Sequence, residues 1–89
     1  MLLTTDNLIN LPVYTQSGEI LGKIKEIEID PSTQAISRYF IKSNQMIKRL
    51  SAKQLIIRPN QVISLDKRKM IVEDAVIRQE SLVGEAATL

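Results

Sequence analysis

The stretch S17-G-E-I-L-G-K-I-K-E-I-E-I-D-P31 decides the fold of this 89-residue chain. Two glycines stand near its start, an Asp-Pro pair closes it, and isoleucines at regular intervals fill the middle. Glycine reaches turn conformations at no steric cost, and proline presets the backbone of the turn that follows. We therefore expect one long, curved β-strand that begins after a glycine turn and ends at a proline turn.

A helix is the alternative for this stretch, because Ile20, Leu21, Ile24 and Ile27 are spaced as on one helix face. Ile29 falls off that face, and each glycine weakens a helix by roughly 1 kcal/mol relative to alanine. β-Branched side chains also pack better on a pleated surface than on a helix. The pattern therefore favours a strand.

The strand pattern changes phase in its middle. Ile20, Gly22 and Ile24 share one parity, whereas Ile27 and Ile29 share the other, and the change falls at Lys25-Glu26. A β-bulge at this point would return the apolar side chains to one face and bend the strand. A glycine in a bent strand permits close backbone approach, as a small barrel requires.

Length and composition indicate one small domain. The chain is 44% hydrophobic but only 3% aromatic, so its core must consist of Ile, Leu and Val. It has no cysteine and so no disulfide, which is typical of a reducing compartment. No apolar run approaches the ~18 residues of a membrane span, and the first residues do not resemble a signal peptide. A cytoplasmic location is expected.

The net charge of +2 conceals an uneven distribution. Residues 42–69 contain eight basic side chains and one acidic side chain, Asp66, which gives this span +7 and the remainder −5. Such a split indicates one basic surface and an anionic partner. The alternative is that the lysines and arginines only keep loops and strand edges soluble.

The rest of the chain reads as short strands separated by turns. Pro12 places residues 13–15 at a strand start or a sheet edge, and residues 16–19 form a tight turn into the long strand. A second hairpin joins that strand to residues 35–42. Further strands are expected at 55–57, 62–65 and 70–72, with residues 74–77 packed against the barrel rim. The residues with structural roles at turns and bends are Gly18, Gly22, Asp30, Pro31 and Pro59.

Two segments are harder to interpret. Residues 43–54 form either a short helical turn within 46–54 or a basic loop, because Met46, Ile47 and Leu50 are the apolar positions there. Residues 78–89 have the composition of a C-terminal tail, in which a further short helical turn is possible. Leu82 and Val83 are its candidates for docking on a partner.

Several motifs together resemble the PRC-barrel domain family. The opening motifs are L11-P-V-Y14, S17-G-E-I-L-G-K-I24 and I27-E-I-D-P31. The later motifs are L55-I-I-R-P-N-Q-V-I-S64 and M70-I-V-E-D-A75. The resemblance covers about residues 8–77, and no single motif is specific by itself. Two positions depart from the pattern: Gln34 stands where the family commonly has glycine, and Pro59 follows Arg58 rather than an apolar residue.

The resemblance implies an all-β fold, a small antiparallel barrel of five to six strands. Residues 1–7 would be an N-terminal lead-in, residues 8–77 the domain and residues 78–89 a tail. The family includes the cytoplasmic barrel of the photosynthetic reaction centre H subunit and a domain of the ribosome maturation factor RimM. Its members mostly act in docking or assembly rather than catalysis, an analogy of fold that does not fix function.

The residues themselves offer little for catalysis. The chain has no histidine, so a serine nucleophile would lack its usual base. Glu26 and Glu28 lie two apart on one strand face, a spacing compatible with two-carboxylate chemistry, but neighbouring lysines favour a solvated face. No phosphate-binding glycine loop or ordered set of calcium ligands is present. We expect no enzyme activity, no cofactor and no metal.

The expected function is therefore macromolecular docking or assembly, with a protein as the partner. The candidate surfaces are an open sheet edge at 13–15, the segment 43–54 and the tail, and a homodimer is plausible. The alternative is an RNA or ribosome contact through the basic span 42–69, although Tyr14 and Tyr39 offer few stacking platforms and Phe40 is expected in the core. Candidate partner-binding residues are Lys48, Arg49, Lys53, Lys67, Arg68, Lys69, Leu82 and Val83.

Overall fold

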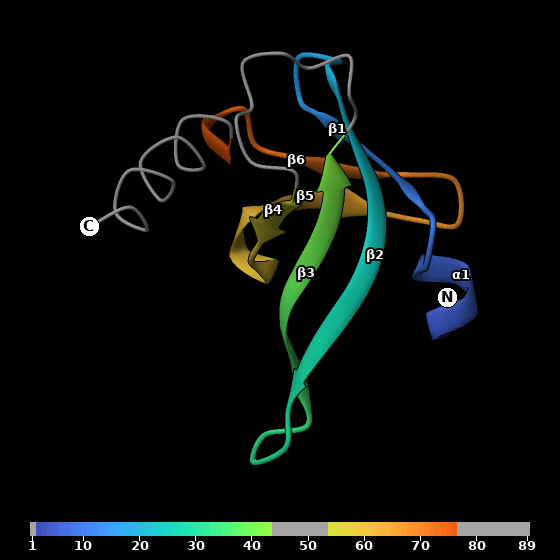
Figure 1. Ribbon diagram of the computed structural model, residues 1–89, viewed down its shortest axis with the longest axis vertical. Coiled ribbons are helices and arrows are strands. Elements are labelled where there is room, and N and C mark those ends of the chain that lie inside the picture. The colour runs from blue at the N-terminus through green and yellow to red at the C-terminus, as the bar shows by residue number, and fades with distance from the viewer. Residues whose placement is uncertain (1, 44–53, 77–89) are drawn as a thin grey trace.

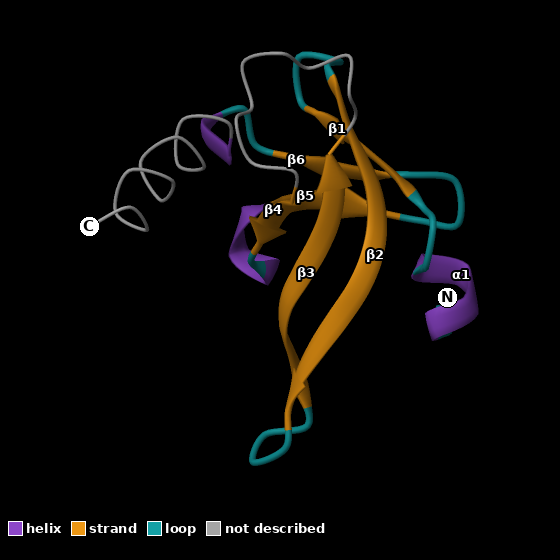
Figure 2. Ribbon diagram, viewed as in Figure 1, coloured by secondary structure: helices purple, strands orange, loops and turns teal. Residues whose placement is uncertain are grey.

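A computed structural model describes residues 2–43 and 54–76, and its strands form one curved sheet (Figure 1). A short helix α1 precedes the strands, and a 3₁₀ turn η1 lies between the fourth and fifth (Figure 2). The elements are α1 (Thr5–Leu8), β1 (Pro12–Thr15), β2 (Ile20–Asp30), β3 (Ala35–Ser43), β4 (Gln54–Ile57), η1 (Pro59–Gln61), β5 (Val62–Leu65) and β6 (Met70–Val72). The all-β prediction and the expected strand positions are confirmed.

The six strands are ordered β4-β3-β2-β1-β6-β5. All neighbours pair antiparallel except β1 and β6, which run parallel. Among the described residues β4 and β5 do not pair with each other, so the sheet is a barrel that is not fully closed. The prediction of an open edge at residues 13–15 is wrong, because β1 lies inside the sheet between β2 and β6.

The bulge expected in the long strand is present. The register of β2 against β3 passes from Ile24 opposite Ile41 to Glu26 opposite Phe40, so Lys25 is the inserted residue. Beyond the bulge Ile27 pairs with the buried Tyr39 and packs on the core. The inserted residue therefore returns the isoleucines to the core side, as the change of phase in the sequence predicted.

The expectation that Phe40 lies in the core is wrong. Opposite Glu26, Phe40 lies on the outer side of the sheet and is only half-buried. Its neighbours Tyr39 and Ile41 occupy the core, with Tyr39 4% exposed. Successive residues of a strand face opposite sides, so only one of the two adjacent aromatic residues can be buried here.

The two glycines of the decisive stretch have different roles. Gly18 has a φ of +98° in the β1–β2 turn, as expected of a turn glycine. Gly22, with a φ of +152°, lies where the backbone of β3 crosses closely: a Cβ at this position would stand 1.9 Å from the carbonyl oxygen of Lys42. Gly22 thus permits the close approach that the bent strand needs.

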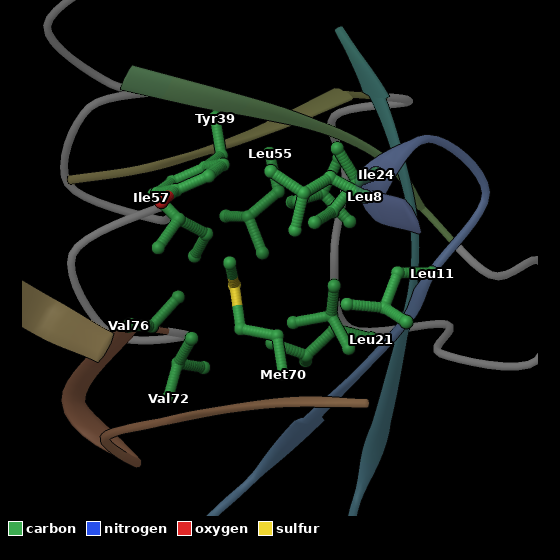
Figure 3. Packing of buried hydrophobic residues seen from close by; sticks show 12 residues of the cluster. Leu8, Leu11, Leu21, Ile24, Tyr39, Leu55, Ile57, Met70, Val72 and Val76 are labelled. Carbon is green, nitrogen blue, oxygen red and sulfur yellow. The ribbon is translucent and has the colours of Figure 1, made fainter. Parts of the chain in front are cut away.

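The core is a single cluster inside the curved sheet, in which Tyr39 and Met70 join the expected Ile, Leu and Val side chains (Figure 3). Each strand from β1 to β4 and β6 contributes fully buried side chains, and α1 and the segment after β6 cover the ends. Its members are Leu8, Leu11, Val13, Leu21, Ile24, Tyr39, Ile41, Leu55, Ile57, Met70, Val72 and Val76. The burial of Val76 agrees with the expectation that the segment after β6 packs on the barrel.

Helix α1 was not expected from the sequence. It is capped at Thr4, whose hydroxyl accepts a hydrogen bond from the Asn7 amide at 3.3 Å while the Thr4 amide donates to Asn7 Oδ1 at 2.9 Å. This reciprocal pair is the arrangement of a capping box, with Asn in the place of Glu or Gln. The helix is too short to be stable alone, and the burial of Leu8 in the core holds it in place.

The β2–β3 turn is built as its Asp-Pro pair predicts. Asp30 Oδ1 accepts a hydrogen bond from the Ser32 amide at 2.8 Å, which is an Asx turn. The turn closes with Gln34 donating its amide to the Asp30 carbonyl at 2.7 Å. Gln34 has a φ of +62°, a left-handed conformation in which a glycine is normally found. The departure from the family pattern at this position thus corresponds to a strained residue.

Replacing Gln34 with glycine is expected to stabilise the domain. Relief of the left-handed strain is worth about 1–2 kcal/mol, and the added flexibility of the unfolded chain offsets part of it, so a net gain of about 0.5–1 kcal/mol should appear in urea unfolding. Asn10, also left-handed with a φ of +71°, is the control. Asparagine tolerates this conformation, so Asn10→Gly should gain less. An unchanged or lower stability for Gln34→Gly would contradict the assignment of strain.

The second half of the barrel turns at Pro59, as expected. Pro59 occupies the first position of η1, where its missing amide hydrogen costs nothing. The side chain of Gln61, 6% exposed, accepts a hydrogen bond from the Arg58 amide at 2.7 Å. The helical turn expected within 46–54 and the tail at 78–89 lie outside the described residues, apart from Gln54, which begins β4. In the described part of the chain, no helix is long and apolar enough to cross a membrane.

Candidate interaction surfaces

The β2–β3 hairpin extends beyond the core as an arm, which we define as residues 27–38. Figure 2 shows both strands continuing past the rest of the sheet to the turn at the lower end of the molecule. On the core side of the arm Ile29 pairs with Ile36. Ile36 still packs against the core, but Ile29 is 54% exposed because nothing in the described chain lies beneath the end of the arm. The arm thus presents an apolar side chain to solvent.

The outer side of the arm carries an ion pair. Arg38 donates from Nε to Glu28 Oε1 at 2.7 Å and from Nη2 to Glu28 Oε2 at 2.9 Å, a bidentate geometry. The Arg38 guanidinium also lies 5.2 Å from the centre of the Phe40 ring, within the range of a cation–π contact. These contacts join the two strands of the arm on the side away from the core, and we expect them to stiffen the arm.

The ion pair shifts the titration of its carboxylate. Hydrogen bonding from Arg38, together with its positive charge, lowers the pKa of Glu28 below the ordinary value of 4.5. A carboxylate whose pKa is lowered on folding contributes stability above the unfolded pKa, and this contribution is lost as the pH falls through the folded pKa. The pair should therefore persist as the pH falls through 4.5, where an ordinary glutamate is half-protonated, and be lost only at lower pH.

We expect Arg38→Gln to return the pKa of Glu28 towards 4.5, since the substitution removes both hydrogen bonds and the charge. Carboxyl carbon NMR across a pH titration measures this pKa directly. Asp66, whose pKa is lowered by the backbone amides of Arg68 and Lys69 instead, is the internal control and should be unaffected. A Glu28 titration that does not change in the variant would show that the pair does not persist in solution.

The two-carboxylate arrangement considered for Glu26 and Glu28 is not an acid–base pair in this structure. Both face outward, but Glu28 is held as a carboxylate by Arg38, which is the opposite of the raised pKa that a general acid needs. Burial raises the pKa of Tyr39, and backbone amides lower the pKa of Asp66. Each of these shifts has a structural cause. Within residues 2–43 and 54–76, no group of three or more acidic side chains is placed to hold a metal ion.

Part of the predicted basic surface is described. The β5–β6 turn is closed by Asp66, which accepts hydrogen bonds from the amides of Arg68 at 2.7 Å and Lys69 at 3.0 Å. Lys67, Arg68 and Lys69 are therefore held on an ordered, exposed turn. Lys48, Arg49 and Lys53, with Leu82 and Val83, lie outside the described residues.

The register adds Lys23, which lies outside the predicted basic span, and sets it beside Lys42, which belongs to that span. Lys42 lies directly opposite Lys23 on the outer side of β3 and β2, and Lys23 is opposite Pro12 at the start of β1. Because Val13 is level with Met70 in the parallel pair, Pro12 is level with Lys69. We define the basic row as Lys42, Lys23 and Lys69. Like charges directly opposite each other on neighbouring strands destabilise a sheet. The basic row therefore lowers the stability of the fold.

Fold and surfaces together define a small, barrel-like β domain with an extended hairpin arm and a basic row, without a recognisable catalytic constellation in its described part. The family profile of the PRC-barrel domain matches residues 3–76. The chain belongs to the PRC-barrel domain family, as its motifs suggested. The comparison with curated proteins gave no match.

Proposed function

We propose that this protein is a non-catalytic docking module that binds another protein through the arm. The observation that carries the proposal is Ile29, an isoleucine 54% exposed on a hairpin that projects past its own core. Exposed apolar side chains are common singly. Ile29 differs from such isolated residues because the bidentate Glu28–Arg38 pair joins the two strands of the arm that carries it. A stiffened arm loses little conformational freedom on binding, which favours affinity.

The proposal includes a cytoplasmic location and the absence of catalysis. A cysteine-free chain suits a reducing compartment. Each shifted pKa among the described residues has a structural cause, which accords with a function in binding rather than in catalysis. An anchor of the type proposed would insert Ile29 into an apolar pocket of the partner, with Ile36 and Ile27 continuing the contact towards the core.

The test compares Ile29→Ser with Ile9→Ser, since Ile9 is another exposed isoleucine, 38% exposed, that lies outside the arm. Proteins captured from native lysate by the wild-type chain after nuclease treatment are identified, and the affinity of the purified partner for each variant is then measured by calorimetry. Loss of a buried isoleucine at an interface corresponds to roughly 10- to 100-fold in affinity. Ile9→Ser should bind as the wild type does. Equal binding by both variants would contradict docking through the arm.

The second candidate function, an RNA or ribosome contact, is favoured by the basic row. Three lysines aligned across the sheet, next to an ordered turn that carries Lys67 and Arg68, match the repeated charge of a phosphate backbone. Tyr14 is half-buried and Phe40 lies under Arg38, so base stacking has little support. Binding of this kind would be steeply salt-dependent and independent of base sequence.

The same capture experiment separates the two functions. If RNA is the partner, nuclease should abolish capture, and the combined substitution Lys23→Gln, Lys42→Gln and Lys69→Gln should reduce affinity for single-stranded RNA at least tenfold at low salt. The triple variant should leave a protein partner's affinity within about threefold of the wild-type value, because none of the three lysines lies on the arm.

A further inference from the structure

A row of apolar side chains crosses the outer side of the sheet, away from the arm. Tyr14 of β1 is level with Ile20 of β2 on one side and with Ile71 of β6 on the other. Ile71 pairs in turn with Ser64 of β5, and Ile63 is the inserted residue of the bulge beside that pair. We define the apolar stripe as Ile20, Tyr14, Ile71 and Ile63. The register therefore aligns apolar side chains from four neighbouring strands.

The stripe is not part of the core. In β1 and β6 its members alternate with Val13, Thr15, Met70 and Val72, all of which are at most 2% exposed inside the barrel. Ile63 is 50% exposed, and the other three members are partly exposed. The outer side of a solvated antiparallel sheet normally carries polar residues in this alternation. Four outward apolar positions in one row therefore indicate a surface that another molecule covers.

Opposite charges border the stripe on its two long sides. On the side where β1 and β6 begin, Lys23 lies opposite Pro12, and Lys69 immediately precedes Met70. On the side where these strands end, Glu19 lies next to Ile20 at the start of β2, and Glu73 follows Val72. Lys69 and Glu73 each lie two residues, or roughly 7 Å, from Ile71, and Lys23 is level with Pro12, two residues before Tyr14, whereas Glu19 directly precedes Ile20. The surface is thus apolar along its centre line, basic along one margin and acidic along the other.

We propose that the apolar stripe is the contact between two copies of this chain, related by a two-fold axis that runs along the stripe. Rotation about this axis lays the stripe of one copy on the stripe of the other. The basic margin of each copy then lies against the acidic margin of its partner. Lys69 then faces Glu73 of the second copy. A two-fold interface must be complementary to itself, and a stripe with opposite charges at equal distances on either side satisfies that condition. A membrane surface or an acidic peptide would match only the basic margin.

The contact is small, because the stripe contributes one side chain from each of four strands. Interfaces below about 1,200 Å² of total buried area are weak and transient. The dimer should therefore form with a dissociation constant in the range of about 10–100 µM and exchange with the monomer. The arm lies outside the stripe, so this dimer and the docking proposed above are independent, and the failure of either leaves the other intact.

Sedimentation equilibrium of the full chain from about 5 to 500 µM tests the proposal. Ile63→Lys should weaken the dimer at least tenfold, because it places a charge in the apolar stripe, where no charge faces it on the second copy. Lys69→Glu and Glu73→Lys should each weaken it about tenfold, since each sets like charges against each other. The combination of these two reversals should restore an affinity within about threefold of the wild type, which a loss of folding cannot produce. Lys25→Glu, an exposed charge at the β2 bulge, is the matched control and should have no effect.

Three sedimentation results would overturn the proposal. The chain sediments as a monomer up to 500 µM; or it dimerises without response to Ile63→Lys; or the two single reversals weaken the dimer and their combination does not restore it. Thermal unfolding of each variant, followed by circular dichroism, confirms that the barrel is intact. Vesicles containing anionic lipid provide the remaining comparison: binding to them by a monomer, lost in Ile63→Lys, would assign the stripe to a lipid surface and overturn the dimer.

Discussion

Replacing Gly22 with alanine is expected to lower the free energy of unfolding by about 3 kcal/mol or more. The new Cβ would stand 1.9 Å from the carbonyl oxygen of Lys42 and 2.9 Å from its carbonyl carbon. Neither atom belongs to a flexible side chain, so β3 itself would have to move away from β2. A φ of +152° adds strain for any residue with a Cβ. A small domain with a total stability of roughly 5–10 kcal/mol loses a large part of it in this way.

Gly18→Ala is the matched control for this prediction. Gly18 also has a positive φ, +98°, but a Cβ there would meet no atom within 4 Å. Only the conformational cost of about 1–2 kcal/mol applies. Urea unfolding of the two variants separates the cost of conformation from the cost of close approach. Equal losses for the two variants would mean that β3 moves aside easily, and that the close crossing at Gly22 does not hold the barrel together.

The sequence predicted those features of the fold that depend on local chemistry. Glycine at a turn, an Asp-Pro pair and a change of apolar phase each act within a few residues, so Gly18, Asp30 and the bulge at Lys25 lie in the structure as expected. Even the strain at Gln34 was visible as a departure from the family pattern. Pairing between strands far apart in the chain has no such local signal. The parallel pairing of β1 with β6 therefore could not be predicted, and the 13–15 edge was misplaced.

The surfaces were harder to predict than the fold for the same reason. The basic span in the sequence contains Lys42 and Lys69 but not Lys23, which joins them only through the register of β2. The apolar stripe likewise draws on four separate strands. Phe40 was assigned to the core from its chemistry, whereas its side is decided by the alternation of β3, in which Tyr39 and Ile41 face the core. Composition suggests that a surface exists, and only strand order shows which residues share it.

Ile24 and Ile29 show the difference between core and surface most sharply, because both are isoleucines on the core side of β2. Ile24 is 0% exposed and opposite Ile41, whereas Ile29 is 54% exposed and opposite Ile36 at the end of the arm. Ile24→Ala removes buried methyl groups and leaves a cavity, which costs about 2–5 kcal/mol. For a domain of this size the melting temperature should fall by at least about 10 °C.

Ile29→Ala should change the free energy of unfolding by no more than about 0.5 kcal/mol, because the side chain already lies largely in water. Its effect should appear instead in binding to the partner, which calorimetric titration of the folded variant measures. Ile24→Ala, examined below its own melting temperature, should bind with nearly wild-type affinity. A stable Ile24→Ala variant would contradict the packing of β2 on the core. A large loss of stability in Ile29→Ala would show that the arm folds back against the barrel, and its apolar end would then serve the fold rather than a partner.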